Sequence, residues 1–537
     1  SPTPGAANDQ TPSAMLTSQT PSFAVAPGVY SGSQNVTLTS TAGYKICYST
    51  DGSDPRSASS YVYSSGSVTV GALAAETSGL AWLRTNPVEI TNNVPNAGWQ
   101  VPSGSVTRAV TLRAVTVSSD GKYCSPEACG TYFIGSIFTN RTLPVVSIIA
   151  NTNDLFGFVS GLFVPGKCYA DSAKGYGSNK WGKPYANYHQ DNVDEVWERP
   201  VHFELIETNR TTPSVTQRLG LAMYGGGSRA LPQKTLYLMA RETEYGTGIV
   251  NYALFPDEAA TSYKRFLLRN SGNDWYGPNT SGVATMMKDA VFERIIKGLN
   301  LSVMAYRPAV VYINGEYWGL HNLRESYDKN YLATRYGIDP DSADILMHEE
   351  DPDDSGKVVI TRVDGSKSAD DDYEAMLDWV ETNTLSAATF YQQLQQKIDV
   401  ANYTDYIIVE TFFGNTDWPL NNCDFWRTHT NEVAACGVYG DTRWRWLLYD
   451  LDLSGTEGAN YNMFAYLSDN SMTGRHEPGY LINTLWNIND YQTNFVARYA
   501  NLLNTTFRPE RTAKIVTLAA DAIASEMETH YRRWGRP

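Results

Sequence analysis

The apolar residues change their spacing along the chain, and this change limits the folds that the chain can adopt. Up to about residue 138, short apolar runs such as 36–39 and 110–115 are separated by clusters of Gly, Ser, Asp and Pro. Many short strands with such turns are typical of a small β-sandwich. From about residue 261 the apolar residues recur with the spacing of helices, most clearly at 290–299. We therefore expect an α+β chain in which an all-β sandwich precedes a mixed domain.

The pattern divides the chain into four parts. Between the sandwich and the helices, residues 144–149, 198–205 and 234–238 form apolar or alternating runs that predict strands. An Asn-Gly pair at 314–315 between two apolar runs predicts a hairpin, and residues 369–413 and 483–534 predict helices. The expected parts are a linker at 1–20, the sandwich at 21–138, a β-rich segment at 139–260, and a core with a helical part at 261–537.

Charge and hydrophobicity narrow the classes of partner. The chain has 537 residues and a formal net charge of −15, whereas nucleic-acid binding needs a basic face, so we expect no nucleic-acid partner. We expect no transmembrane segment either, because no run of about 18 apolar residues is present. The polar start at residues 1–8 is typical of a linker exposed after a signal peptide is removed. It predicts an exported protein, extracellular or attached to the cell surface.

Six cysteines are present, and none forms a Cys-x-x-Cys pair. No His cluster accompanies them, so a structural zinc site is not expected. Cys124 lies close to Cys129 in the sequence, and Cys423 and Cys436 flank a predicted hairpin. Either pair fits a local disulfide as well as it fits two free thiols, and the sequence does not decide between them.

The strongest chemical signal comes from two Asp residues and an Asn. Asp417 precedes Asn422 by five positions, and Asp450 ends the apolar run 446–449. Protein kinases space their catalytic Asp, their Asn metal ligand and their strand-end metal Asp in a similar way. In phosphoryl transfer one carboxylate takes the proton of the acceptor hydroxyl, while the Asn and the second carboxylate hold Mg²⁺.

Each of these residues also has a purely structural interpretation. Asp417 suits an Asx turn, and Asp450 with Asp452 suits a pair of strand-end carboxylates that face water. Because side chains alternate along an extended segment, Asp450 and Asp452 are predicted to share one face and to reach one metal ion. Asn421 is the alternative to Asn422 as the amide ligand.

Seven segments, in the same order, resemble the spore-coat protein H (CotH) kinase family, from about residue 144 to the C-terminus. The resemblance implies an atypical protein-kinase-like fold, with a β-rich N-lobe and a helical C-lobe around an ATP cleft. It implies transfer of the ATP γ-phosphate, with Mg²⁺ or Mn²⁺, to Ser or Thr of a surface or spore-coat protein. The segments are 143–147, 225–229 with Lys234, 266–270, 288–290, 312–319, 415–422 and 449–452.

The N-terminal part has a resemblance of its own. Residues 46–55 read Ile-Cys-Tyr-Ser-Thr-Asp-Gly-Ser-Asp-Pro, which resembles the small β-sandwich appended to chitobiases and to many bacterial surface proteins. Within it, Gly52 and Pro55 suit a tight turn. The resemblance implies a spacer or presentation module, or a direct contact with polysaccharide.

The kinase resemblance assigns a glycine-rich loop over the phosphates. Glycines let backbone N–H groups approach an anion closely, and two basic residues follow them. Three consecutive glycines also make a plain hairpin turn. The residues that this role would involve are Gly225, Gly226, Gly227, Ser228, Arg229 and Lys234.

The resemblance also assigns an ion pair beside the phosphates. Arg269 ends a predicted strand where kinases place a phosphate-binding Lys, so it is expected to act in catalysis, with Lys264 as the alternative. Asp289 or Glu293 would be its partner, although both also suit stabilisation of a helix start. Glu325 is expected between the lobes, near the nucleotide, or in a plain salt bridge.

Three functions are compatible with these observations. A kinase needs Asp417, Asn422 and Asp450 together, whereas a pseudokinase scaffold would tolerate Arg269 in place of Lys. A polysaccharide-binding surface protein would use the sandwich and some of the 13 Trp and 35 Tyr residues. A glycoside hydrolase is disfavoured, because only the kinase-like set places carboxylates about a cleft. Nucleotide binding separates the first function from the others.

Overall fold

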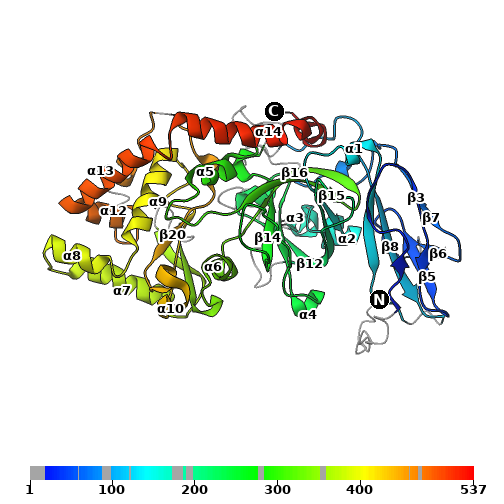
Figure 1. Ribbon diagram of the computed structural model, residues 1–537, viewed down its shortest axis with the longest axis horizontal. Coiled ribbons are helices and arrows are strands. Elements are labelled where there is room, and N and C mark those ends of the chain that lie inside the picture. Colours follow the sequence, from blue (N-terminus) through cyan, green and yellow to red (C-terminus); the bar gives the residue numbers. More distant parts are fainter. Residues whose placement is uncertain are drawn as a thin grey trace.

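The computed structural model places three parts side by side: an N-terminal β-sandwich, a closed sheet and a second sheet surrounded by helices (Figure 1). It describes residues 19–57, 60–86, 98–119, 123–171, 186–188, 197–275, 284–350, 358–458, 460–469 and 474–536. The linker expected at residues 1–20 lies almost entirely outside these ranges. The fold is of the predicted α+β class.

The N-terminal part is a sandwich-like arrangement of short strands, as predicted. Its largest sheet has the order β2-β9-β8-β5-β6, and the pairs β1-β4 and β3-β7 lie against it. Thr37 interrupts the single run expected at 36–39, so that two strands form there. The strands are β1 (Ser22–Phe23), β2 (Gly28–Tyr30), β3 (Gln34–Val36), β4 (Leu38–Thr39), β5 (Lys45–Ser49), β6 (Tyr61–Tyr63), β7 (Val68–Val70), β8 (Val110–Val117) and β9 (Ala128–Ile134).

The centre of the molecule is a closed sheet with the order β10-β11-β12-β13-β14-β16-β15. Its neighbours are antiparallel except for β10 and β15, whose parallel pairing closes the ring. The sheet continues past residue 260, where the sequence analysis placed the start of the core. Its strands are β10 (Val145–Ile149), β11 (Arg199–Ile206), β12 (Val215–Tyr224), β13 (Thr235–Met239), β14 (Arg265–Arg269), β15 (Tyr306–Ile313) and β16 (Glu316–Arg324).

The hairpin predicted at 314–315 is confirmed, and it docks the sandwich onto the closed sheet. Asn314 and Gly315 both have positive φ, 46° and 81°, as a two-residue hairpin turn requires. Gly315 O accepts a hydrogen bond of 2.8 Å from Ala109 N. The Glu316 carboxylate accepts from Leu80 N and Ala81 N at 3.0 and 2.9 Å. The stretch around residue 80 therefore binds the hairpin to the sandwich.

The second sheet has the order β18-β17-β19-β20, and helices surround it (Figure 1). Helix α9 is buried on nearly every side, which is typical of a central core helix. The helices expected at 369–413 are confirmed; they are α7 (Ala369–Thr382), α8 (Ala387–Leu394) and α9 (Val400–Phe413). The strands are β17 (Ala343–Glu350), β18 (Val358–Asp364), β19 (Cys423–Thr428) and β20 (Arg445–Leu447).

Two helices connect the closed sheet to this helical part. Helix α5 (Lys288–Ile296) stacks Phe292 on Phe413 of α9, with ring centroids 4.5 Å apart. The long helix α14 (Pro509–Trp534) runs across the top of Figure 1 and hydrogen-bonds Trp534 Nε1 to Trp318 O of β16 at 2.9 Å. Helices α12 (Gly479–Trp486) and α13 (Asn489–Asn504) precede it, so the helical prediction for 483–534 is confirmed.

The remaining helices are short. The α-helices are α1 (Ser136–Thr139), α2 (Thr152–Phe156), α3 (Gly166–Ala170), α4 (Glu242–Tyr245), α6 (Lys329–Tyr336), α10 (Val433–Cys436) and α11 (Met463–Leu467). The 3₁₀ turns are η2 (Leu80–Trp82), η4 (Gly227–Ala230), η5 (Gly272–Asp274), η6 (Pro340–Ser342), η7 (Gly437–Gly440) and η8 (Leu451–Leu453).

Two findings bear on the expectations from composition. All six cysteines are free, so neither candidate pair forms a disulfide in this structure. Within the described ranges, no helix combines the length and the apolar character that a membrane span needs.

Candidate active site

A cleft of about 1090 Å³ lies between the closed sheet and the second sheet. One side is lined by β12, β13 and β14, and the other by residues of β17 and β19 and by the segment after β20. Gly225, Arg269, Asn422 and Asp450 all line it. The cleft therefore brings together residues from both halves of the predicted site.

Asp417 lies in the turn that follows α9. Its Oδ2 accepts a hydrogen bond of 3.0 Å from Asn422 Nδ2, and its Oδ1 accepts one of 3.3 Å from Asn421 Nδ2. Partial burial raises the pKa of the Asp417 carboxyl, and the negative charge of Asp450 raises it further. Asp417, Asn422 and Asp450 are therefore neighbours, as their spacing predicted.

Asp450 and Asp452 come together by a geometry that differs from the prediction. Strand β20 ends at Leu447, Asp450 has a left-handed φ of 57°, and the 3₁₀ turn η8 follows. The segment is therefore not extended, and the expectation that alternation sets the two carboxylates on one face was wrong. Both carboxylates reach the Arg269 guanidinium because the chain turns back on itself there.

Asn422 and Asp450, the two candidate metal ligands that line the cleft, share an unusual backbone conformation. Their φ values are 58° and 57°, a left-handed region that non-glycine residues seldom adopt. Such residues cluster at functional sites, because the surrounding structure must hold them in place. The shared conformation supports a role for both.

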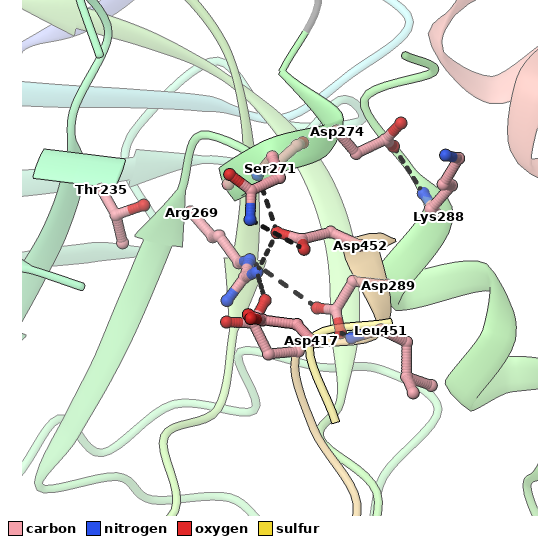
Figure 2. A network of polar contacts seen from close by, with 12 residues as sticks. Thr235, Arg269, Ser271, Asp274, Lys288, Asp289, Asp417, Leu451 and Asp452 are labelled. Atoms are coloured by element: carbon pink, nitrogen blue, oxygen red, sulfur yellow. Dashed lines mark hydrogen bonds and ion pairs between the residues drawn. The ribbon is translucent and has the colours of Figure 1, made fainter. Parts of the chain in front are cut away.

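Arg269 is at the centre of a carboxylate network (Figure 2). Its Nη2 pairs with Asp450 and, at 2.9 Å, with Asp452 Oδ2, while its Nε lies 3.7 Å from Asp289 Oδ2. Burial lowers the pKa of the guanidinium, but the three carboxylates outweigh it and raise the pKa well above its usual value. Arg269 ends β14 as predicted, and Asp289 is a partner, but the closest contacts are with the segment 450–452.

A second buried arginine extends the network. Arg324 of β16 lies 3.1 Å from Asp289 Oδ2 and pairs with Glu293, which also accepts a hydrogen bond from Met304 N. Glu293 therefore pairs with Arg324 and not with Arg269. Burial raises the pKa of Glu293 to about 8, although the positive charge of Arg324 opposes the shift.

The glycine-rich run lies partly where the sequence placed it. Gly225, Gly226, Ser228 and Arg229 line the cleft, whereas Gly227 begins the short turn η4 and is not part of the lining. Gly225 has a φ of 106°, a conformation that glycine adopts without strain. The run thus combines the predicted cleft-facing loop with a tight turn.

Lys234 does not face the cleft, so the structure contradicts its expected place on a phosphate-facing edge. The side chain is fully buried and donates hydrogen bonds of 2.6 and 2.7 Å to Arg229 O and Leu231 O. Its ammonium also lies over the Tyr188 ring, 3.6 Å from the centroid. Burial holds the pKa of Lys234 well below its usual value. Lys234 therefore stabilises the backbone directly after the glycine-rich run instead of contacting the cleft.

Glu325 forms the plain salt bridge that was the alternative to nucleotide contact. Its carboxylate pairs with Arg335 of α6 and accepts a hydrogen bond of 2.8 Å from Ala305 N. It lies outside the lining of the cleft.

The comparison with protein families agrees with this geometry. A profile of the family described as CotH kinase protein matches residues 221–537, more than half of the chain. The chain belongs to the CotH kinase protein family. A second profile, described as the chitobiase/beta-hexosaminidase C-terminal domain, matches residues 25–124. Both resemblances inferred from the sequence are confirmed. A search of curated proteins finds no match.

The CotH kinase family implies ATP-dependent phosphotransfer with a divalent metal ion. In the described part of the chain, no group of three His, Cys, Asp or Glu side chains could hold a metal. Mg²⁺, however, often binds through one or two carboxylates together with water and phosphate oxygens. Asp450 and Asn422 supply such oxygens on the cleft wall and fit that requirement. Asp452 does not line the cleft, and its carboxylate accepts hydrogen bonds from Arg269 and Asn273 N.

Several residues of this CotH-family site were missed by the sequence analysis. Asn415 donates to the buried Glu410 carboxylate at 3.1 Å and to Asp450 O at 3.4 Å, and accepts from Asp417 N at 3.3 Å. It therefore ties the Asp417 turn to the Asp450 segment. Asp274 accepts hydrogen bonds from Met287 N and Lys288 N, which fixes the start of α5. Asn415 was visible inside the motif, but its partners come from separate segments.

Proposed function

We propose that this chain is an ATP-dependent protein kinase that phosphorylates Ser or Thr of a protein substrate. In this proposal the closed sheet is the N-lobe, and the second sheet with its helices is the C-lobe. The observation that carries it is the contact of Asp417 with Asn422 and its proximity to Asp450. Asn422 and Asp450 line the same cleft as Gly225 and Arg269, and Asp417 lies directly behind Asn422. Phosphoryl transfer needs this combination of a base, metal ligands and phosphate contacts.

Each residue has a definite task in this reaction. Asp417 accepts the proton of the acceptor hydroxyl, and the amides of Asn421 and Asn422 hold its two oxygens in place. Asp450 and Asn422 hold the divalent metal, which neutralises the charge of the phosphates when it is bound. Arg269 adds a fixed positive charge beside Asp450.

The first test is calorimetric binding of ATP with and without Mg²⁺. We expect micromolar affinity that needs Mg²⁺ and that falls by at least about tenfold in Asp450→Ala, because a metal ligand is removed. Asp521→Asn is the control, since Asp521 lies exposed on α14. A folded protein that binds no nucleotide would disprove the kinase proposal and favour a scaffold.

The second test follows the γ-phosphate to a protein acceptor. Asp417→Asn should keep nucleotide affinity but lower transfer by about 10²–10⁴-fold, because it removes the proton acceptor and leaves the metal ligands. Unchanged transfer in Asp417→Asn would contradict the role of this residue as the base.

A contact with surface polysaccharide is a second candidate function. Tyr48, Tyr61 and Tyr63 form an aromatic cluster on β5 and β6, and Tyr61 is 60% exposed. A tyrosine side chain combines an apolar ring with a polar hydroxyl group, so it suits a binding surface that is partly apolar and partly hydrated. Co-sedimentation with insoluble polysaccharides tests it: loss of binding in Tyr61→Ala would support the contact. The same proposal places the protein outside the cell, on the surface or in a spore coat.

A further inference from the structure

The cleft is larger than the phosphate-binding end requires. Its volume of about 1090 Å³ is at the upper end of small-molecule sites, whereas Gly225, Arg269, Asn422 and Asp450 form only part of its lining. Apolar and aromatic side chains line much of the rest. On the closed-sheet side these are Tyr224, Tyr237, Met239 and Leu267, and on the opposite side Tyr327, Met347, Val363 and Tyr449.

Asp424 is the carboxylate among these side chains on the second sheet. Strand β19 carries it, between Met347 of β17 and Leu447 of β20, and only 8% of its surface is exposed. Tyr449 donates a hydrogen bond of 3.2 Å to Asp424 Oδ1. Burial raises the pKa of the Asp424 carboxyl to about 7, but its oxygens can accept hydrogen bonds in either protonation state. One donor therefore leaves acceptor capacity for a ligand in the cleft.

The position of Asp424 along the chain links it to the phosphate end. Asp424 follows Asn422 by two residues, and its partner Tyr449 directly precedes Asp450. A ligand whose phosphates reach Asn422 and Asp450 therefore has its next groups beside Asp424 and Tyr449. Across the cleft, Tyr224 packs against Tyr237 with ring centroids 5.2 Å apart.

We propose that Asp424 recognises the purine base of the nucleotide by accepting a hydrogen bond from its exocyclic amine. The Tyr224–Tyr237 pair and Met347 supply apolar surface for the faces of the ring. This inference rests on the proposed kinase function and adds the residue that selects the nucleotide. It also predicts a preference for an amine-bearing base, because the ionised carboxylate has no proton to donate to a carbonyl oxygen at the same place.

Matched nucleotides test the proposal without any protein substrate. Calorimetry compares ATP with purine riboside triphosphate, which lacks the 6-amine, and GTP with inosine triphosphate, which lacks the 2-amine. We expect the wild-type protein to bind at least one amine-bearing nucleotide about 10–100-fold more tightly than its analogue, as for a hydrogen bond to a charged group. Equal affinities within both pairs would overturn the proposal.

Two variants assign the preference to Asp424. Asp424→Leu should bind each nucleotide and its analogue equally. Tyr449→Phe should keep the preference, because it removes only the hydrogen bond that Tyr449 donates to Asp424. Binding of Mg²⁺ with inorganic tripolyphosphate should stay unchanged in Asp424→Leu, which shows that the cleft is folded. A preference that persists in Asp424→Leu, or tripolyphosphate binding lost together with it, would overturn the assignment.

The failure of this inference is distinguishable from the failure of the kinase proposal. If wild-type protein binds nucleotides and Asp450→Ala weakens that binding, the kinase proposal stands whatever Asp424 does. If wild-type protein binds neither nucleotide nor tripolyphosphate, both proposals are wrong.

Discussion

At the scale of single residues, the cleft is organised by two buried arginines that share one carboxylate. Arg269 and Arg324 both approach Asp289 Oδ2, at 3.7 and 3.1 Å. Arg269 also pairs with Asp450, and Arg324 also pairs with Glu293. Because a buried charge is stable only when it is paired, this chain of ion pairs fixes the position of the Asp450 segment relative to α5.

The first prediction concerns Arg324. Arg324→Met should lower the free energy of unfolding by about 3–5 kcal/mol, because Asp289 loses a charged partner and Glu293 loses a hydrogen-bond donor. Both come from a side chain that is only 1% exposed. Urea unfolding followed by tryptophan fluorescence measures this loss.

Arg294→Met, on helix α5, is the matched control. Arg294 pairs with Asp257 at 3.3 Å, and the two side chains are 40% and 71% exposed. We expect a loss below about 1 kcal/mol for this surface pair. Equal losses in the two variants would show that the buried network does not carry the stability assigned to it.

The sequence predicts the local part of this site well. The contact between Asp417 and Asn422 follows from a spacing of five positions, so it depends on few distant residues. The geometry at Asp450 could not be predicted, because its left-handed backbone is held by segments far away in the sequence. Lys234 follows a glycine run that lines the cleft, and only the packing of Tyr188 shows that it points inward.

At the scale of elements, the fit of α14 on β16 joins two distant segments of the CotH-family match. Gly319 of β16 has a φ of 102°, and a Cβ there would lie 2.7 Å from Trp534 Nε1 of α14. The helix therefore packs directly on the strand backbone. The strand and the helix could each be predicted from their own pattern, but their contact depends on residues about 200 positions apart and leaves no local signal.

The second prediction concerns Glu526 of α14, near Tyr317 of β16. Burial raises the pKa of Glu526 from 4.5 to about 7. The folded state holds the proton of Glu526 more tightly than the unfolded state. The contribution of this group to the free energy of unfolding is therefore fully present below pH 4.5 and falls as the pH rises to about 7. Between pH 4.5 and about 7, the free energy of unfolding of Glu526→Gln should therefore rise relative to that of wild type by on the order of 2–3 kcal/mol.

Thermal unfolding of both proteins between pH 4.5 and 8 measures the difference. Glu528→Gln, on the exposed part of the same helix, is the control. A difference between Glu526→Gln and wild type that stays constant with pH would contradict the assigned shift.

At the scale of the whole molecule, the sandwich and the closed sheet form one continuous structure. Thr131 N of β9 donates a hydrogen bond of 3.0 Å to the buried Glu204 carboxylate of β11, and Val29 N of β2 donates one of 2.7 Å to Thr211 O. Arg113 of β8, which is only 3% exposed, donates hydrogen bonds to Ala150 O at 3.4 Å and to Asn151 Oδ1 at 2.9 Å, directly after β10. The sequence predicted the two parts but not the contacts between them, because contacts between domains leave no periodic pattern.

The third prediction tests this docking. In Gly315→Ala the new Cβ would collide with Ala109 O and lie 2.9 Å from Thr111 Oγ1, so the sandwich should separate from the hairpin. We expect the free energy of unfolding to fall by about 1–3 kcal/mol beyond the cost of the positive φ itself. Calorimetry should then resolve a separate transition for the sandwich.

Gly66→Ala is the matched control. Gly66 has a similar φ of 86°, but a Cβ there meets nothing within 4 Å. The two variants share the backbone strain, of about 1 kcal/mol, and differ only in the collision. Identical melting profiles would contradict a docking role for the hairpin.

The contacts between the sandwich and the Asn314–Gly315 hairpin also limit how a chain like this one can evolve. A recombination event that replaced the sandwich with an unrelated module would leave Glu316 without the N–H groups of Leu80 and Ala81, and Glu204 without that of Thr131. Two buried carboxylates would lose donors at once, which costs about 1–3 kcal/mol for each. A module that replaced the sandwich in this chain would therefore have to supply equivalent N–H donors, although two family profiles divide the sandwich from the rest.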